Sequence, residues 1–131
     1  MRGFTHFAAL DWSGARGLRH RGIALAVASG STAPELVRPG HIWSRGEILS
    51  WLEGMAKAGT DILIGFDFSA GFAFADQGAY FPLWNESPAD LPSLWSLVER
   101  LTAGDPHYEI GGFLTHPESR RHFRHARGNG G

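Results

Sequence analysis

Apolar positions in the first half of the chain gather in short runs separated by turn-forming residues, and two of these runs have the same form. The first covers residues 4–10 and ends before Asp11; the second covers residues 62–66 and ends before Asp67. Neither run contains Asp, Glu, Lys or Arg, which is typical of strands buried on both faces in parallel or mixed sheets. An acidic residue at the carboxyl end of such a strand lies where open α/β sheets bind their ligands. We therefore expect a functional site at these two strand ends.

Two further runs, residues 21–28 and 35–38, predict strands that lie between the two aspartates in the sequence. Glycine, serine and proline residues separate the runs and form turns, so hairpins are the simplest connections. Pro39 and Gly40 stop the second of these runs, which suits a strand at the edge of a sheet. We expect the first three strands to pair in antiparallel order.

Ser44 and Glu47 have the spacing of a capping box, in which the serine accepts a hydrogen bond from a helix amide and the glutamate reaches back. Apolar residues follow at helical spacing and predict a helix over about 45–58. A helix placed between two strands is a crossover connection, so the next strand should lie parallel to the first. Both aspartates then lie at the same end of the sheet.

The second half of the chain contains one clear helix, over residues 88–103, with an apolar stripe that glycine and proline residues terminate. The aromatic stretch 69–87 has no periodicity and is expected to pack in a core or beneath another segment; base stacking is the alternative. We expect an incomplete core over residues 1–103. Residues 104–131 should form an irregular basic segment, with one short strand around 108–110.

Length and composition limit the classes of protein. With 131 residues, 43% of them hydrophobic, the chain can form one domain with a core. It has no cysteine, so any metal would bind Asp, Glu or His, which favours Mg²⁺ or Mn²⁺. No apolar run approaches the roughly 20 residues of a membrane span, and the N-terminus has no signal-peptide pattern. We expect a cytoplasmic protein without a membrane segment.

The formal net charge of −1 is unevenly distributed. All thirteen acidic residues lie at or before Glu118, together with eight basic residues, and the last four arginines follow. Tight binding along a nucleic-acid backbone usually requires a basic face. The distribution argues mildly against a strong nucleic-acid binder, although nucleic acid stays a candidate partner.

Asp11 and Asp67 are the strongest candidates for chemistry. Neighbouring parallel strands lie about 4.8 Å apart, so carboxylates at matching heights can bridge one cation. The alternative is that each aspartate caps a turn by accepting hydrogen bonds from backbone amides. Glu47 is a candidate third metal ligand, in competition with its capping-box role, which we favour. The candidate substrate-binding residues near the aspartates are Ser13, Arg16 and Ser69.

The order strand-strand-strand-helix-strand-helix, with an acid ending the first and fourth strands, resembles the ribonuclease H-like fold. The strand-end motifs Asp11-Trp12-Ser13-Gly14 and Gly65-Phe66-Asp67-Phe68-Ser69 look like those of a poorly characterised bacterial family of predicted ribonuclease H-like nucleases. The resemblance covers roughly residues 4–103. It implies an α/β fold with a mixed sheet of order 3-2-1-4-5, of which this chain would form the part 3-2-1-4 with two helices.

The resemblance also implies a function, two-metal phosphodiester hydrolysis, in which Asp11 and Asp67 bind Mg²⁺ or Mn²⁺ that activates water and stabilises the leaving oxygen. The fold normally continues into a fifth strand and a last helix with a further acidic or histidine ligand, and no matching pattern follows Thr102. We therefore expect an N-terminal part of a longer protein, inactive or partial by itself. The missing C-terminal half or a partner chain would pair with the edge of the fourth strand.

Two other function classes stay open. One is a non-catalytic module that keeps the fold to bind a partner or to join an assembly. The other is half of an actin-like or sugar-kinase protein, whose first phosphate loop also begins with an aspartate. That class requires a second, duplicated half with its own aspartate loop, which this sequence does not contain.

Overall fold

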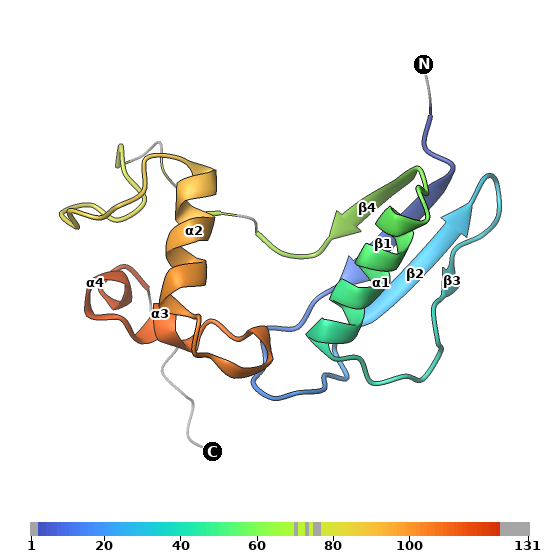
Figure 1. Ribbon diagram of the computed structural model, residues 1–131, viewed down its shortest axis with the longest axis horizontal. Coiled ribbons are helices and arrows are strands. Elements are labelled where there is room, and N and C mark those ends of the chain that lie inside the picture. Colours follow the sequence, from blue (N-terminus) through green and yellow to red (C-terminus); the bar gives the residue numbers. More distant parts are fainter. Residues whose placement is uncertain (1–2, 70, 73, 75–76, 124–131) are drawn as a thin grey trace. The chain divides into compact units, whose positions relative to one another are not determined.

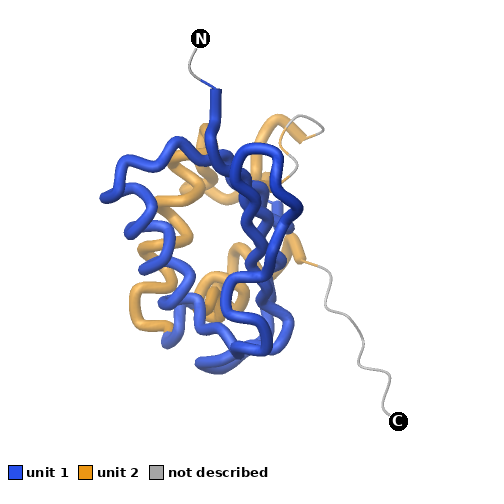
Figure 2. Tube along the Cα trace, turned by 90° about the vertical axis from the view of Figure 1, so that its right-hand side faces the viewer, with its two compact units in different colours: residues 1–69, 106–108 blue, residues 70–105, 109–131 orange. Residues whose placement is uncertain are grey.

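The chain folds into two compact units, each with its own hydrophobic core. The computed structural model describes residues 3–69, 71–72, 74 and 77–123. Unit 1 comprises residues 1–69 and 106–108, and unit 2 comprises residues 70–105 and 109–131 (Figure 2). The main division thus falls after Ser69 rather than after residue 103, because the second long helix packs with the segments that follow it.

Unit 1 contains a four-stranded mixed sheet (Figure 1). Its strands are β1 (His6–Asp11), β2 (Ala24–Ser29), β3 (Glu35–Leu36) and β4 (Ile62–Phe66), in the order β3-β2-β1-β4. β2 is antiparallel to both β1 and β3, whereas β4 is parallel to β1. The predicted mixed sheet and its strand order are confirmed.

The helix α1 (Arg45–Lys57) covers one face of this sheet (Figure 1). Ile48, in its first turns, is 1% exposed and packs with Leu10 and Leu25 of the two central strands. Burial of an aliphatic side chain of this size stabilises the fold by about 1.5–3 kcal/mol. The apolar stripe of α1 therefore decides which face of the sheet lies inside.

Unit 2 contains α2 (Leu91–Leu101), which lies within the predicted range 88–103 and begins after the cap residue Asp90. The carboxylate of Asp90 accepts a hydrogen bond from the amide of Ser93 at 2.8 Å. Hydrogen bonding from the Ser93 side chain and, second, from this amide lowers the pKa of Asp90. Two short helices follow, α3 (Gly111–Thr115) and α4 (Pro117–Arg120). The buried core residues of the unit are Phe81, Leu94, Leu97 and Phe113. Phe81 comes from the aromatic stretch, whose predicted role in core packing is confirmed at this position.

Several expectations for the last quarter of the chain are wrong. The described residues form four α-helices rather than two, because α3 and α4 are too short to show a helical period in the sequence. The predicted strand around 108–110 does not form: Pro106–Tyr108 is a 3-10 turn (η1), and His107 and Tyr108 have left-handed φ values of 56° and 57°. The segment is not wholly irregular either, since Phe113 is completely buried. Residues 124–131 of the predicted basic segment lie outside the described residues.

Candidate functional site

The structure brings Asp11 and Asp67 to matching positions on neighbouring parallel strands. Leu10 of β1 pairs with Phe66 of β4, so the two aspartates occupy the next position of the same register. The amide of Asp67 donates a hydrogen bond to the carbonyl oxygen of Leu10 at 3.0 Å, which extends the pairing to this point. The shared register places both aspartates at the same end of the sheet and at the same height, on strands that lie about 4.8 Å apart.

Both aspartates are exposed, and in the described part of the chain neither carboxylate has a hydrogen bond or an ion pair. The turn-capping alternative requires a backbone amide that donates to the carboxylate, and no described amide does so. In the turn after β1, the hydroxyl of Ser13 is the acceptor instead, and it accepts a hydrogen bond from the amide of Ala15 at 3.3 Å. The four carboxylate oxygens are therefore available to a ligand.

Aromatic side chains join the two loops that follow the aspartates. The rings of Trp12 and Phe68 lie 5.8 Å apart, and Phe68 also contacts Phe66 with a ring separation of 5.1 Å. Such tilted aromatic pairs contribute about 0.5–1.5 kcal/mol beyond their buried area. Trp12 directly follows Asp11, and Phe68 directly follows Asp67. The contact between these two rings therefore holds the two strand ends together.

Arg45 binds the backbone of the loop after β1. Its side chain is buried, with 5% of the residue exposed, and its Nη2 donates to the carbonyl oxygens of Ser13 at 2.9 Å and Ala15 at 2.7 Å. Nη1 donates to the carbonyl oxygen of His107 at 2.9 Å, and the guanidinium lies 5.9 Å from the ring of Trp12. Arg45 is not among the site residues that the sequence predicts. The available signal was a cation at the first position of a helix, where the helix dipole disfavours positive charge.

Glu47 caps the beginning of α1 through its side chain. The amide of Ser44 donates to Oε2 of Glu47 at 2.8 Å, while the hydroxyl of Ser44 accepts from the amide of Glu47 at 3.1 Å. Nη1 of Arg19 lies 3.0 Å from Oε2, and Nε2 of His41 lies 3.2 Å from Oε1. The hydrogen bond from the Ser44 backbone is the main cause that lowers the pKa of Glu47 from 4.5 to about 2.

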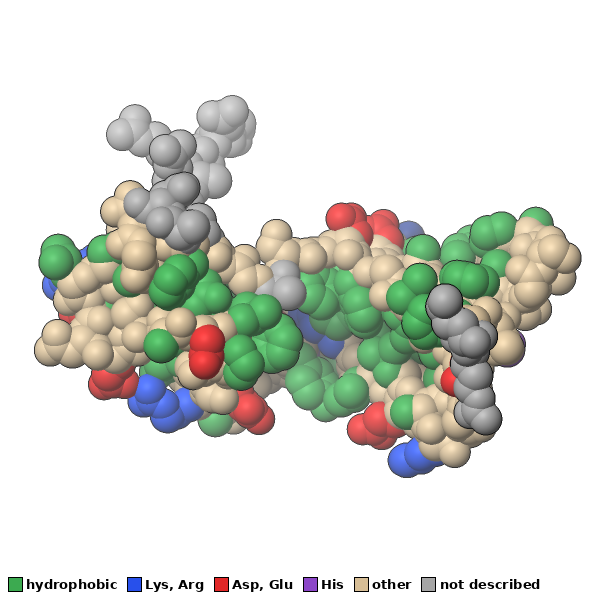
Figure 3. Space-filling model, turned by 90° about the horizontal axis from the view of Figure 1, so that it is seen from above, with side chains coloured by type: hydrophobic (Ala, Val, Ile, Leu, Met, Phe, Trp, Pro, Cys, Tyr) green, Lys and Arg blue, Asp and Glu red, His purple; other side chains and the backbone are tan. Residues whose placement is uncertain are grey.

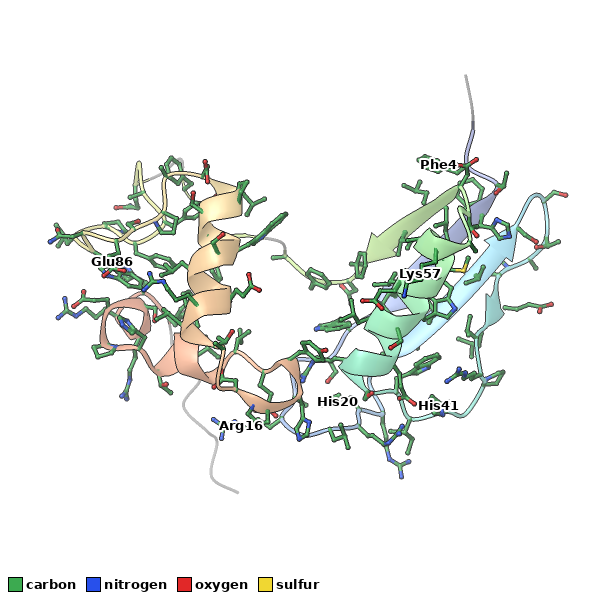
Figure 4. The ribbon with its side chains drawn as sticks, in the orientation of Figure 1. Phe4, Arg16, His20, His41, Lys57 and Glu86 are labelled. Atoms are coloured by element: carbon green, nitrogen blue, oxygen red, sulfur yellow. The ribbon has the colours of Figure 1, made fainter. Side chains whose placement is uncertain are left out.

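Both oxygens of Glu47 thus accept hydrogen bonds at the helix cap, and Glu47 belongs to no group of three or more potential metal ligands among the described residues. The capping box favoured from the sequence is present. His20 and His41 lie near the beginning of α1 (Figure 4). His20 is buried, and its Nε2 has no hydrogen-bond partner among the described residues.

The candidate substrate-binding residues differ in their surroundings. Arg16 is exposed and extends away from the sheet (Figure 4). Ser13 is half-buried, and its hydroxyl is used within the turn. Ser69 is exposed, two residues after Asp67. Of these three side chains, Arg16 and Ser69 are open to a ligand.

Two free carboxylates suit a hydrated Mg²⁺ or Mn²⁺, since Mg²⁺ keeps several waters and binds proteins through one or two carboxylates. The described residues contain no group of three or more His, Asp or Glu side chains placed to hold a metal ion. The donor set at Asp11 and Asp67 therefore fits a weakly held, largely hydrated cation.

Comparison with known proteins gives no relative from which to transfer a function: no family model matches the chain, and no curated protein or solved structure matches it. Among the described residues, every helix is too short or too polar to cross a lipid bilayer. The assignment of function therefore depends on the geometry of the two strand ends.

Proposed function

We propose that this chain carries the metal-binding half of a phosphodiester-hydrolysing site of the ribonuclease H-like kind. The observation that supports the proposal is the position of Asp11 and Asp67, one register step beyond Leu10 and Phe66 on parallel neighbours. Nucleic acid is the proposed substrate and the cytoplasm the proposed location. The aspartates are the proposed metal-binding and catalytic residues.

Each side chain near the site has a distinct proposed task. Asp11 and Asp67 supply negatively charged oxygens that bind the cation. When bound, Mg²⁺ or Mn²⁺ lowers the pKa of a coordinated water and stabilises the leaving oxygen of a phosphodiester. Arg16, in the loop after Asp11, is the proposed phosphate contact once its exposed side chain turns toward the substrate, because a guanidinium matches phosphate geometry and stays charged. Arg45 is a positioning residue, since it contacts the carbonyl groups of the loop rather than the substrate.

The proposed site is partial, because the described residues bring two carboxylates to the strand ends and form no group of three potential ligands. A third ligand would come from a further segment or from a partner chain. We therefore expect cation binding by this chain to be easier to detect than turnover.

A second candidate is a non-catalytic module that uses the same fold to bind a partner. The observation in its favour is the absence of a third metal ligand among the described residues. The two candidates differ in one measurable property, since only the first requires Asp11 and Asp67 to bind a divalent cation together.

Titration calorimetry with Mn²⁺ distinguishes them. The wild type should bind Mn²⁺, and Asp11→Asn and Asp67→Asn should each weaken binding at least about tenfold, a loss of roughly 1.4 kcal/mol. Asp61→Asn is the matched control, because Asp61 precedes the same strand at its opposite end. No binding by the wild type, or equal loss in all three variants, would favour the non-catalytic module.

A further inference from the structure

Within the described residues, the outer edge of β4 has no strand or backbone hydrogen-bonding partner. Among the described residues, β1 is the only strand beside β4. The carbonyl oxygen of Asp61 accepts from the amide of His6 at 3.1 Å, and the amide of Asp67 donates to Leu10 at 3.0 Å. Odd-numbered residues of this segment therefore bond to β1.

Successive peptide groups of a strand point in opposite directions within the plane of the sheet. The amide and carbonyl groups of Ile62, Ile64 and Phe66 consequently point away from β1. These three donors and three acceptors form a template for a further strand.

The side chains of β4 do not protect this edge. Natural edge strands carry lysine, proline, a bulge or an inward-pointing charge, whereas β4 consists of Ile, Leu, Ile, Gly and Phe. Leu63 is 50% exposed and Phe66 is 41% exposed. Figure 3 shows that hydrophobic side chains gather on the surface of unit 1. An apolar edge strand without these protective features is a template for pairing with another chain.

The charges at the two ends of β4 disfavour a second copy of this chain as the occupant. An antiparallel pair of β4 strands centred on Ile64 would place Asp61 opposite Asp67 of the second copy, at both ends. A parallel pair in register would place each aspartate opposite its own equivalent. Like charges directly opposite each other destabilise a strand pair. Both aspartates are exposed, and in the described part of the chain neither has an ion pair.

We propose that the β4 edge binds an extended segment of another protein that carries a basic residue at each end of an apolar stretch. Asp61 and Asp67 are six positions apart and lie on one face of the sheet, so they span about 20 Å along the strand. The basic residues of the partner would face these two acids, and its small apolar residues would lie beside Leu63 and Gly65.

Main-chain hydrogen bonds to Ile62, Ile64 and Phe66 would supply affinity in this arrangement, as in other cases of strand addition. The two charge pairs would supply the register and the choice of partner. Asp67 is shared with the proposed metal site, whereas Asp61 and the main-chain groups of the edge are not, so variants of Asp61 distinguish strand addition from metal binding.

Hydrogen exchange measured by NMR on the dilute protein tests the proposal, with two end-blocked peptides as probes. One is Lys-Thr-Val-Thr-Val-Thr-Lys and the other is Glu-Thr-Val-Thr-Val-Thr-Glu. In the protein alone, the amides of Leu63 and Gly65 should exchange slowly and those of Ile62, Ile64 and Phe66 rapidly. The lysine peptide at saturation should slow the latter three by at least about tenfold, and the glutamate peptide should not.

The variant Asp61→Lys is the charge control, because it leaves the proposed metal site intact and should shift the preference toward the glutamate peptide. Three results would overturn the proposal. Slow exchange of the three outward amides without peptide would show that this chain already fills its own edge. Protection that depends only on protein concentration would identify a second copy. Equal protection by both peptides would remove the role of the two acids.

Discussion

Nη2 of Arg45 donates to the carbonyl oxygen of Ser13 at 2.9 Å, and so joins the first residue of α1 to the loop that follows Asp11. The same nitrogen also donates a hydrogen bond to the carbonyl oxygen of Ala15. A helix that begins at the carboxyl end of β1 thus supplies the group that shapes the neighbouring turn. The conformation of the candidate site depends on this contact as well as on the sheet.

Replacement of Arg45 by alanine should therefore loosen the loop and weaken Mn²⁺ binding severalfold. Partly buried carbonyl groups left without donors cost on the order of 1–3 kcal/mol, so the free energy of unfolding should fall by about 2 kcal/mol. Arg45→Lys should recover only part of this loss, because an ammonium lacks the planar fork that reaches several acceptors.

Urea unfolding and Mn²⁺ calorimetry measure the two effects of the Arg45 variants. Arg21→Ala is the matched control, since Arg21 is exposed. An Arg45→Ala protein with unchanged stability and Mn²⁺ affinity would show that the loop keeps its conformation without the guanidinium.

Glu47 should make the stability of unit 1 depend on acidic pH. Its pKa is lowered in the folded state from 4.5 to about 2. The stabilisation is therefore complete above about pH 4.5 and is lost as the pH falls toward 2. Glu47→Gln keeps an acceptor for the amide of Ser44 but loses the charge, so it should destabilise the protein by about 1 kcal/mol at pH 7.

Unfolding midpoints of wild type and Glu47→Gln at pH 7, 4.5 and 2.5 check this dependence. The difference between the two proteins should shrink as the pH falls below 4.5. Glu53→Gln serves as the control, because the side chain of Glu53 is 55% exposed and lies 3.9 Å from Lys57. A difference that stays constant down to pH 2.5 would contradict the assignment of the acid sensitivity to Glu47.

Gly112→Ala should destabilise unit 2. A Cβ at this position would come closer to the carbonyl oxygen of Leu101 than real Cβ contacts allow, and backbone cannot move aside as a flexible side chain can. Overpacking of this kind costs about 1–3 kcal/mol. The amide of Gly112 also donates to Oδ2 of Asp105 at 2.7 Å, so a backbone shift would strain that bond.

Thermal unfolding followed by tryptophan fluorescence measures the effect of Gly112→Ala. Gly104→Ala is the control, because a Cβ at Gly104 meets no atom within contact distance. Equal melting temperatures for the two variants would mean that the α2–α3 connection adapts more easily than the structure indicates.

Asp67→Asn should affect stability in opposite directions without and with Mn²⁺. Without metal, the substitution removes one of two adjacent negative charges and should stabilise the protein by about 0.5 kcal/mol. With Mn²⁺ at about 100 times its Kd, ligand binding should stabilise the wild type by about 2.7 kcal/mol and the variant far less. Asp61→Asn should follow the wild type under both conditions, and a crossover that fails to appear in urea unfolding would count against a shared cation site.

The sequence alone determined the elements whose signals are local. The capping box at Ser44 and Glu47, the uncharged strands and the crossover helix predicted α1, the order of the sheet and the parallel neighbours β1 and β4. Two of the candidate site residues, Asp11 and Asp67, followed from the same pattern. A residue that ends a strand is placed by that strand, so its neighbour across the sheet can be deduced from topology.

Only the tertiary structure decided the features that depend on contacts distant in sequence. Arg45 reaches carbonyl groups about 30 residues away, and no local pattern records those partners. The short helices α3 and α4 have too few turns to show a period, and the burial of Phe113 against Phe81 selects their conformation. From its residue type alone, Glu47 could bind a metal or cap a helix. The hydrogen bonds from Ser44, Arg19 and His41 place Glu47 in the helix cap, which only the folded structure shows.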